Sequence, residues 1–314
     1  MHDLVTLGEV LLRLSVPSPG RFETTHRLDV QFGGAEANVA AACARLGLRT
    51  AWLSALPENV WGHRVLREFR GHGVDCSFIA MTPRSRLGLY FLEYGVAPRP
   101  IHVLYDRSDS AFSRLTPETV DWNPVRQAKL VHVSGVTPAL GENPRALVRR
   151  VFEEAAEVSF DVNYRAALWS PTEARSFVLS VLPRVRYLFL GQAEAQNVFH
   201  VSGSPETVLR RLSEMAPNAT IALLRGADGS TVFHRGEMVL PKVQHLVKVV
   251  DPIGAGDAYV AGYLWASLRG RSTQDAVDIA ATVAALKCST WGDVALVTER
   301  EVLDALAGGP DVRR

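Results

Sequence analysis

The sequence predicts an α/β protein with a doubly wound, mostly parallel sheet that carries helices on both faces. Strand-like apolar runs alternate with helical patterns at intervals of about 20 to 30 residues, which is the rhythm of parallel βαβ units. Glycine-rich turns at 33–34 and 254–256 stand directly before two of the helical patterns. The runs at 87–94 and 101–107 have no helix between them, so we expect an antiparallel hairpin outside the main sheet.

The first third of the chain contains the elements of this rhythm in order. Apolar and β-branched runs predict strands, and apolar residues at helical spacing predict helices. The expected elements are strands at 4–7, 10–16 and 28–32, a helix from Ala35 that closes at Gly47, a strand at 50–56, a helix at 61–71 and a short strand near 77–79. We expect strands within about 10–30 and 87–107 to form a small β-sheet lid, because lids exclude water from a reactive site.

The rest of the chain continues the alternation. Further strands are expected at 130–135, 158–165, 187–191 and 220–224, the end of a strand at 249–251 with a helical pattern from Asp257, and helices at 276–286 and 299–306. In an open parallel sheet, ligands bind beyond the carboxyl ends of the strands. This rule places Asp161, Asn163 and Arg165 at the ligand edge of the sheet.

Composition limits the classes of function. The 314 residues are 47% hydrophobic and 21% charged, which fits a single α/β domain over 1–314 with an appended lid. A formal net charge of +1 provides no basic surface for nucleic acid, so the expected partners are small molecules and, in a homo-oligomer, copies of the same chain. The sequence has no basic leader and no run of about 18 apolar residues, which predicts a cytoplasmic protein without a membrane span. The widely spaced Cys43, Cys76 and Cys288 are expected to be free, buried thiols.

The segment 249–266 contains the residues that point most directly to chemistry. Gly254, Ala255 and Gly256 allow bare backbone N–H groups to approach an oxyanion, and the following helix adds the positive end of its dipole. Asp257 would repel such an anion unless it had its own task, and accepting the proton of a hydroxyl that attacks phosphorus is such a task. On this hypothesis a side chain added at Gly254 would fill ligand space. The alternative is an N-cap aspartate after an ordinary glycine turn.

Two motifs resemble the signatures of the ribokinase-like, or PfkB-type, sugar kinases. Asp-Pro-Ile-Gly-Ala-Gly-Asp at 251–257 resembles the family's C-terminal signature, and Gly-Gly-Ala-Glu-Ala-Asn-Val-Ala at 33–40 matches its N-terminal signature. The resemblance implies a ribokinase-like fold and the use of ATP and Mg²⁺, and it leaves a requirement for K⁺ open. By the same resemblance, the sugar is contacted by Gly33, Gly34 and Asn38.

Further segments are similar to the branch of this family that phosphorylates 2-keto-3-deoxygluconate. They lie at 88–94, 133–140 and 160–171. The resemblance implies an ATP-dependent phosphotransferase that acts on the terminal hydroxyl of this sugar acid and forms 2-keto-3-deoxy-6-phosphogluconate. Another kinase of the same fold, such as a fructokinase or a ribokinase, and a non-catalytic sugar or nucleotide sensor are the alternatives.

Side chains on the expected hairpin favour an acid sugar. Tyr90 and Tyr105 offer ring faces to a carbon skeleton, and Arg107 offers the fork donors that suit a carboxylate. An ordinary strand also favours tyrosine, which is the alternative explanation. Arg165 is the cation expected to stabilise charge on the transferred phosphoryl group, with a structural salt bridge as its alternative.

The resemblance also assigns the remaining site residues. It implies that Asp293 contacts the substrate and that Glu194 helps to place Mg²⁺ through water, while Gly191 stands where the family usually has asparagine. It places the nucleotide beside the glycine-rich turn at 225–229, which is equally a hairpin turn without a ligand. The residues expected at the nucleotide are Asn163, Arg165, Arg225, Gly226, Gly229, Gly254 and Gly256.

Overall fold

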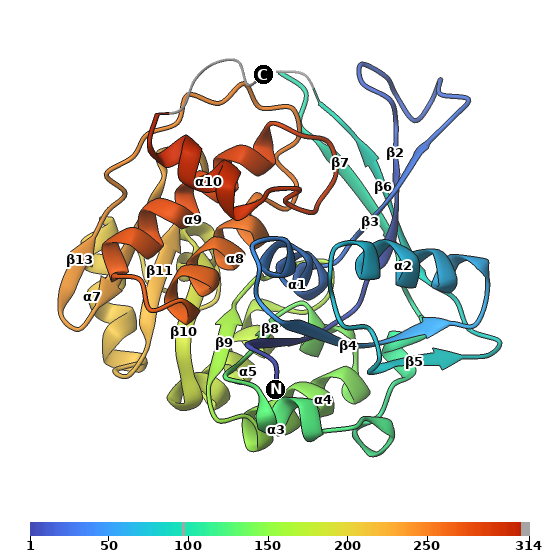
Figure 1. Ribbon diagram of the computed structural model, residues 1–314, viewed down its shortest axis with the longest axis horizontal. Coiled ribbons are helices and arrows are strands. Elements are labelled where there is room, and N and C mark those ends of the chain that lie inside the picture. The colour runs from blue at the N-terminus through green and yellow to red at the C-terminus, as the bar shows by residue number, and fades with distance from the viewer. Residues whose placement is uncertain (96–97, 309–314) are drawn as a thin grey trace.

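Strands and helices alternate along the chain in the computed structural model, which describes residues 1–95 and 98–308 (Figure 1). Residues 96–97 of the predicted hairpin and 309–314 of the predicted domain lie outside the described residues. The strands are β1 (Leu4–Leu7), β2 (Leu11–Ser15), β3 (Asp29–Gly33), β4 (Thr50–Pro57), β5 (Ile79–Thr82), β6 (Gly88–Glu93), β7 (His102–Asp106), β8 (Leu130–Ser134), β9 (Val158–Asp161), β10 (Val185–Gly191), β11 (Thr220–Leu224), β12 (Ser230–His234) and β13 (Glu237–Val239). The α-helices are α1 (Ala35–Arg45), α2 (Val60–Gly71), α3 (Asn123–Gln127), α4 (Glu142–Glu154), α5 (Pro171–Val181), α6 (Gln192–Asn197), α7 (Pro205–Met215), α8 (Ala255–Leu268), α9 (Thr273–Cys288) and α10 (Glu299–Leu306).

The main sheet contains nine strands of the described chain in the order β13-β12-β11-β10-β9-β8-β1-β4-β5. Neighbouring strands pair in parallel from β11 to β5, while β12 and β13 form an antiparallel edge. The predicted doubly wound, mostly parallel sheet is therefore confirmed. Because the chain builds β4 and β5 on one side of β1 and later β8 to β13 on the other, the strand order reverses between β1 and β8. A ligand crevice is expected at the carboxyl ends of the strands beside such a switch point.

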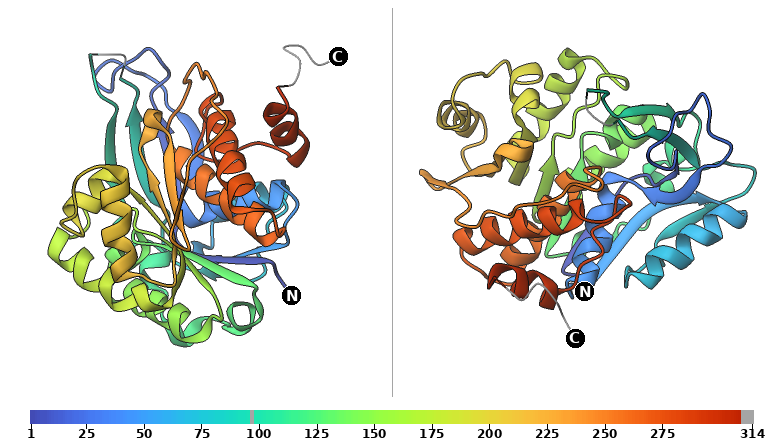
Figure 2. Two further views of the ribbon diagram at one scale, coloured as in Figure 1. Left: turned by 90° about the vertical axis from the view of Figure 1, so that its left-hand side faces the viewer. Right: turned by 90° about the horizontal axis from the view of Figure 1, so that it is seen from above.

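Side chains along the strands alternate between two hydrophobic layers, one on each face of the sheet. In β1, Val5 packs in the layer that contains residues of α3 to α7, whereas Leu4 packs in the layer with α1 and α8 to α10. In β10, Leu188 and Leu190 belong to the first layer and Phe189 to the second. The left view of Figure 2 shows these two layers of helices on opposite sides of the sheet.

A second sheet of four strands stands above the main one, in the order β3-β2-β6-β7 (Figures 1 and 2). Strand β2 pairs antiparallel with β3 and parallel with β6, and β6 and β7 form the predicted antiparallel hairpin. The predicted small sheet is thus confirmed, and it extends through β3 to Gly33, directly before α1. Its register sets Arg13 opposite Tyr90 and Tyr90 opposite Tyr105, so these three side chains project from neighbouring strands on one face.

Several predicted boundaries are wrong. The short strand near 77–79 begins only at Ile79, and β9 ends at Asp161 rather than continuing to 165. The residues 249–251 form no strand, because the N–H groups of Val250 and Asp251 donate to the carbonyl of Cys288 at the end of α9 instead of to a neighbouring strand. α8 begins at Ala255, so Asp257 lies in its first turn and does not precede it.

The predicted free thiols are confirmed for Cys43, Cys76 and Cys288, although Cys288 is only half-buried. In the part of the chain that the structure describes, none of the helices combines the length and the apolar character needed to cross a membrane.

Candidate active site

The first turn of α8 has the geometry predicted for an anion-binding turn, and we call it the anion-binding turn. Gly254 caps the helix in the left-handed conformation, with φ of 82°. Within the described residues, the N–H groups of Gly256 and Asp257 have no protein acceptor, as is usual for the first turn of a helix. The helix contains 14 residues, so its dipole adds positive potential at the same place.

The two glycines of this turn have different roles. A Cβ atom at Gly254 would lie 2.1 Å from the carbonyl oxygen of Asp293, so this position is closed by protein and not by ligand. The expectation that a side chain there would fill ligand space is therefore wrong. A Cβ atom at Gly256, in contrast, would meet nothing within 4 Å, and Gly256 is exposed. Gly256 is the glycine that faces the open side of the turn.

Asp257 faces the N-terminus of α1 across the switch point. Its Oδ2 accepts a hydrogen bond of 2.7 Å from Nδ2 of Asn38, while Oδ1 of Asn38 accepts the N–H of Gly34 at 3.3 Å. Burial raises the pKa of Asp257 to about 7, and the hydrogen bond from Asn38 and the charge of Arg165 act in the opposite direction. Near neutral pH this carboxyl group exchanges a proton readily, as a general base requires.

A second group of polar side chains follows β9. Asp161 is buried, and burial followed by the charges of Glu194 and Asp257 raises its pKa well above the usual range. Asn163 adopts a positive φ of 40° and donates to Asp161 at 2.9 Å, while its own Oδ1 is buried and has no partner among the residues that the structure describes. Arg165 is exposed. Its positive charge acts on Asp161, Glu194 and Asp257 and partly offsets the rise that burial causes in their pKa values.

Glu194 joins the loop after β9 to the end of β10. Its two carboxylate oxygens accept the N–H groups of Tyr164 and Gly191, each at 2.6 Å. Burial raises the pKa of Glu194 despite these hydrogen bonds. Oxygen donors from Asp161 and Asn163 and this neighbouring carboxylate suit Mg²⁺, which keeps several waters and takes few protein ligands. No group of three or more His, Cys, Asp or Glu side chains that would enclose a metal is found among the described residues.

Asp293 lies in a buried network that sequence reasoning recognised only in part. Both of its carboxylate oxygens accept from the Tyr90 hydroxyl at 2.7 Å, and Oδ1 also accepts from Arg13. Arg13 is fully buried, and its Nη2 also donates to Oδ2 of Asp251 at 2.6 Å. A Cβ atom at Gly33 would lie 2.1 Å from Oδ2 of Asp293, which explains a glycine at this point.

Arg13 was missed because a charged residue within an apolar, alternating strand is normally assigned to the solvent face. The signal that was available is its context, Leu11-Leu-Arg13-Leu-Ser15, in which a guanidinium stands in a run of leucines. Tyr94 and Lys287, which also contact Asp251, carried no comparable signal in the sequence.

The guanidinium of Arg107 is not entirely free to bind a carboxylate ligand, because it already pairs with Glu9. Its Nε and Nη2 atoms donate to Oε2 of Glu9 at 3.0 and 2.5 Å, and its guanidinium lies 5.7 Å from the Tyr105 ring centroid. Glu9 is buried, and its Oε1 has no partner in the described structure. The Nη1 atom of Arg107 is therefore the part of the fork that is left for a ligand.

The turn at 225–229 connects β11 and β12 as a hairpin. Arg225 donates its N–H to the carbonyl of Gly229 at 2.9 Å, and Gly226 and Gly229 have positive φ values of 58° and 81°. Side chains at either glycine would meet nothing within 4 Å. Both glycines are thus accounted for by the turn itself, and the contact of this turn with a nucleotide stays a prediction.

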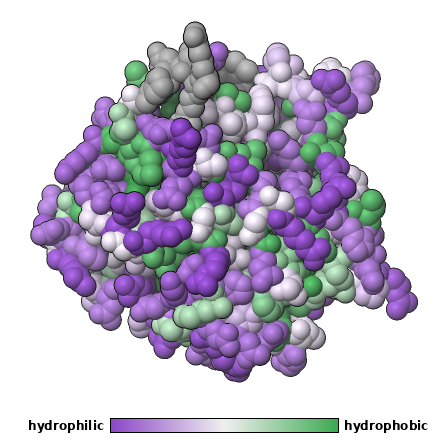
Figure 3. All heavy atoms as spheres, viewed as in Figure 1, coloured by the Kyte–Doolittle hydropathy of each residue, from purple (hydrophilic) through white to green (hydrophobic). Residues whose placement is uncertain are grey.

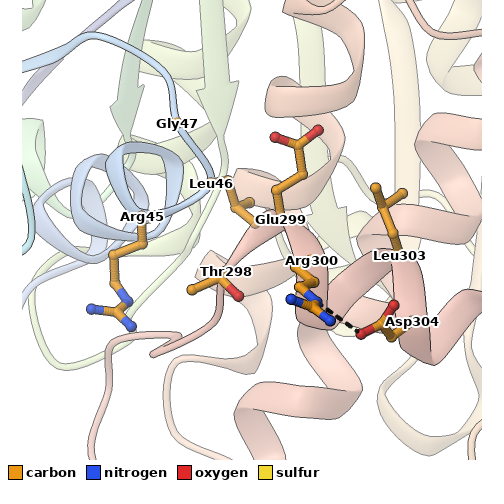
Figure 4. A pocket seen from close by; sticks show the side chains of 8 residues that line it. All are labelled: Arg45, Leu46, Gly47, Thr298, Glu299, Arg300, Leu303 and Asp304. Atoms are coloured by element: carbon orange, nitrogen blue, oxygen red, sulfur yellow. Dashed lines mark ion pairs between the residues drawn. The ribbon is translucent and has the colours of Figure 1, made fainter. Parts of the chain in front are cut away.

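A groove of about 510 Å³ lies away from these residues, between the C-terminal end of α1 and α10 (Figure 4). Arg45 and Leu303 line it, and Arg300 pairs with Asp304 on its wall. α1 has 11 residues, so Arg45 lies roughly 15 Å from the end of the helix that faces Asp257. Because of this distance, the groove takes no part in the candidate site.

Figure 3 shows the side of the molecule seen in Figure 1, where hydrophilic side chains predominate.

Comparison with known proteins gives consistent matches over the whole chain. A family model described as pfkB family carbohydrate kinase matches residues 1–299. A 2-dehydro-3-deoxygalactonokinase from Haloferax volcanii is 38% identical over 311 residues, which cover 98% of this chain and 97% of that protein. The crystal structure of a 2-dehydro-3-deoxygluconokinase from Thermotoga maritima has a TM-score of 0.92 at 31% identity and covers 98% of this chain and 100% of that one. An Escherichia coli structure described as a ribokinase II with ATP and Mg²⁺ has a TM-score of 0.89 at 20% identity, covers 98% of this chain and 99% of that one, and supports the fold alone.

The contrast between Gly254 and Gly256 gives a test of the anion-binding turn. We expect Gly256→Val to reduce phosphoryl transfer at least about tenfold with little change in melting temperature, because its side chain enters open space beside the free N–H groups. Gly254→Ala is the matched comparison and should lower the melting temperature, since it combines a positive φ with a contact to the Asp293 backbone. Thermal melts and initial rates on both variants separate the two effects. A Gly256→Val protein with parental kcat and KM would show that ligand does not approach this turn.

Proposed function

Because the chain belongs to the pfkB family of carbohydrate kinases and is a phosphotransferase that acts on a hydroxyl group, we propose that it transfers the γ-phosphoryl group of ATP to the terminal hydroxyl of 2-keto-3-deoxygluconate. The products would be ADP and 2-keto-3-deoxy-6-phosphogluconate. The 4-epimer, 2-keto-3-deoxygalactonate, is the second candidate, because the Haloferax relative bears that activity in its name. The predicted cytoplasmic location, the homo-oligomer and the single domain stay predictions.

The observation that carries this proposal is the position of Asp257 in the first turn of α8. Its carboxylate accepts the proton of the sugar's terminal hydroxyl, whose oxygen forms a bond to the γ-phosphorus while the bond from that phosphorus to the bridging oxygen of ATP breaks. Negative charge on the transferring group then faces the free N–H groups of Gly256 and Asp257. Arg165, which is exposed and whose charge already acts on Asp257, is the cation proposed to share this negative charge.

Asp161, Asn163 and Glu194 are the residues proposed to hold Mg²⁺, mostly through water. Bound there, the ion would neutralise phosphate oxygens of the nucleotide. Burial raises the pKa values of Asp161 and Glu194, and a cation bound there would act in the opposite direction and favour their ionised forms. The unpartnered Oδ1 of Asn163 supports the same assignment, because a buried acceptor without a donor suits a ligand.

The lid supports a sugar acid as the substrate. Asn38 donates to Asp257, and Gly33 lies against Asp293, which accepts from the Tyr90 hydroxyl. The sugar is proposed to bind beside Asn38 and Asp257, with Gly33 and Gly34 at the start of α1, the helix that contains Asn38. Arg107 is held by Glu9 with Nη1 left over, so a guanidinium of fixed orientation is available to a carboxylate beside the exposed Tyr105 ring.

Replacement of the base tests the mechanism. We expect Asp257→Asn to lower kcat by about 10²–10⁴-fold, the usual contribution of a positioned base. In the parent, kcat/KM should rise with pH through about 7, because only the deprotonated carboxylate accepts a proton.

Stability provides the matching control for this prediction. The folded-state pKa of Asp257 is raised, so ionisation of the buried group costs stability as pH rises through about 7. Asp257→Asn should therefore melt higher than the parent at pH 8 and show a smaller difference at pH 5. Activity within threefold of the parent, or a kcat/KM profile that falls between pH 6 and 8, would remove Asp257 from the chemistry.

Replacement of Arg107 tests the class of substrate. We expect Arg107→Ala to lower kcat/KM for 2-keto-3-deoxygluconate by at least about tenfold, because a charge-assisted hydrogen bond contributes roughly 1.5–3 kcal/mol. The rate with fructose or ribose should change little. The double variant Glu9→Gln/Arg107→Ala removes the carboxylate that the single variant leaves unpaired, and it should show the same selectivity. Arg86→Ala, whose partner is the exposed Asp106, is the matched control on the lid.

The same assays separate the alternatives. A parent enzyme that prefers fructose or ribose would contradict the acid-sugar assignment and leave the kinase assignment intact. A parent that binds ATP and releases no ADP with any of these sugars would favour the non-catalytic sensor.

A further inference from the structure

Behind the anion-binding turn the structure buries a lysine that the proposed mechanism does not use. Lys287 lies in the last turn of α9 and is fully buried. Its Nζ donates to the carbonyl oxygen of Asp251 at 2.8 Å and lies 3.8 Å from Oδ1 of the same residue. A buried ammonium loses several kcal/mol of hydration, so a chain retains one only where protein oxygens replace the lost water. Here one aspartate supplies both a carbonyl and a carboxylate oxygen.

Lys287 completes a charge balance in the buried network. Asp251 and Asp293 contribute the negative charges, and Arg13 and Lys287 contribute the positive ones. Burial lowers the pKa of Lys287, while the charges of Asp251 and Asp293 act in the opposite direction and favour the ammonium form. Loss of either cation would leave this buried network with one more negative charge than positive charges.

Asp251 connects this network to the turn of α8. Its Oδ1 accepts the N–H of Ile253 at 2.9 Å, and its Oδ2 accepts the N–H of Gly292 at 3.0 Å. One residue further on, Gly254 packs against the backbone of Asp293. The ammonium of Lys287 therefore holds one end of the segment 251–254, and Asp293 holds the other.

We propose that the ammonium of Lys287 is a built-in monovalent cation that positions the segment 251–254, so that phosphoryl transfer at this turn needs no added K⁺. Lys287 is a positioning residue, because it is fully buried and acts through Asp251. Carbonyl and carboxylate oxygens are also the donors that K⁺ and free ammonium take. Since Nζ lies 2.8 Å from the carbonyl oxygen and 3.8 Å from Oδ1, we expect it to exclude a second cation from these oxygens. The proposal rests on phosphoryl transfer at α8, as proposed above.

The test replaces the side chain and returns a free cation. Lys287→Ala leaves room for a cation beside Asp251. Lys287→Gln keeps a hydrogen-bond donor, but it removes the positive charge and leaves no room for a free cation. Lys129→Ala is the control, because Lys129 pairs with Asp3 on the surface and precedes the amino end of β8, opposite the ligand edge. Rates are measured in the chlorides of K⁺, NH₄⁺, Na⁺ and tetramethylammonium at equal ionic strength.

We expect the parent and Lys129→Ala to have rates within about twofold in all four salts, because only screening acts on them. In tetramethylammonium chloride the kcat of Lys287→Ala should fall at least about tenfold, as for the loss of a charged hydrogen bond. K⁺ and NH₄⁺ should restore part of it, and Na⁺ less. Lys287→Gln should be as slow and should not respond to any of the salts.

Melting temperature gives a readout that needs no substrate. A cation that binds only the folded Lys287→Ala protein must raise its melting temperature, whereas the parent should not respond. A rise of about 2 °C or more in K⁺ over tetramethylammonium is expected, since one kcal/mol corresponds to a few degrees in a chain of this size. This measurement is independent of the sugar, so a wrong substrate assignment would appear in the parent's rates and leave the cation result unchanged.

Four outcomes would overturn the proposal. They are a parent activated more than tenfold by K⁺, a Lys287→Ala protein with parental kcat in tetramethylammonium chloride, a slow Lys287→Ala protein that responds to no cation in rate or melting temperature, and a Lys287→Gln protein with parental kcat. If the alanine variant does not fold, the cation response of the parent and the kcat of the glutamine variant decide the question.

Discussion

The anion-binding turn of α8 depends on the buried charge network behind it. A helix start that leaves N–H groups free for a phosphoryl group must be held from its other side, since the ligand cannot hold it before it arrives. Here the network of Arg13, Asp251, Lys287 and Asp293 closes that side. Its members come from the lid, the turn and the end of α9, so one set of interactions fixes both the turn and the strands above it.

The carboxyl groups on the open side of the turn differ electrostatically from the network of paired charges behind it. The charges of Glu194 and Asp257 both act on Asp161, and burial raises the pKa of all three carboxyl groups. Under the proposed function, a nucleotide that binds with a divalent cation would bring positive charge beside these groups and favour their ionised forms. The charges behind the turn, in contrast, are paired within the protein itself.

Much of the fold and part of the site could be predicted from the sequence, for reasons that particular residues make clear. Parallel strands that are buried on both faces leave continuous apolar runs, and at Gly33, Gly34 and Gly254 an added side chain would meet atoms of another segment. A side chain at Gly256 would meet nothing, and only Gly254 of the two has a positive φ. The role of each glycine was not predictable, because these differences in conformation and surroundings are not visible in the sequence. Arg13 and Lys287 were missed because their partners lie far along the chain. The segment 249–251 has β-branched residues but no strand edge beside it, and this is a tertiary fact that propensity does not contain.

The separation of these partners along the chain has a consequence for how the protein comes into being. Arg13 and Asp293 are 280 residues apart, and Asn38 and Asp257 are 219 residues apart. During synthesis the N-terminal strands β1 and β2 emerge long before the segments that neutralise and cover them. Loop closure on this scale is slow, so the site is among the last parts of the molecule to assemble. While the chain is being synthesised, the N-terminal residues of the site are present before the C-terminal residues that complete it. We therefore expect phosphoryl transfer to begin only after the C-terminal helices have docked.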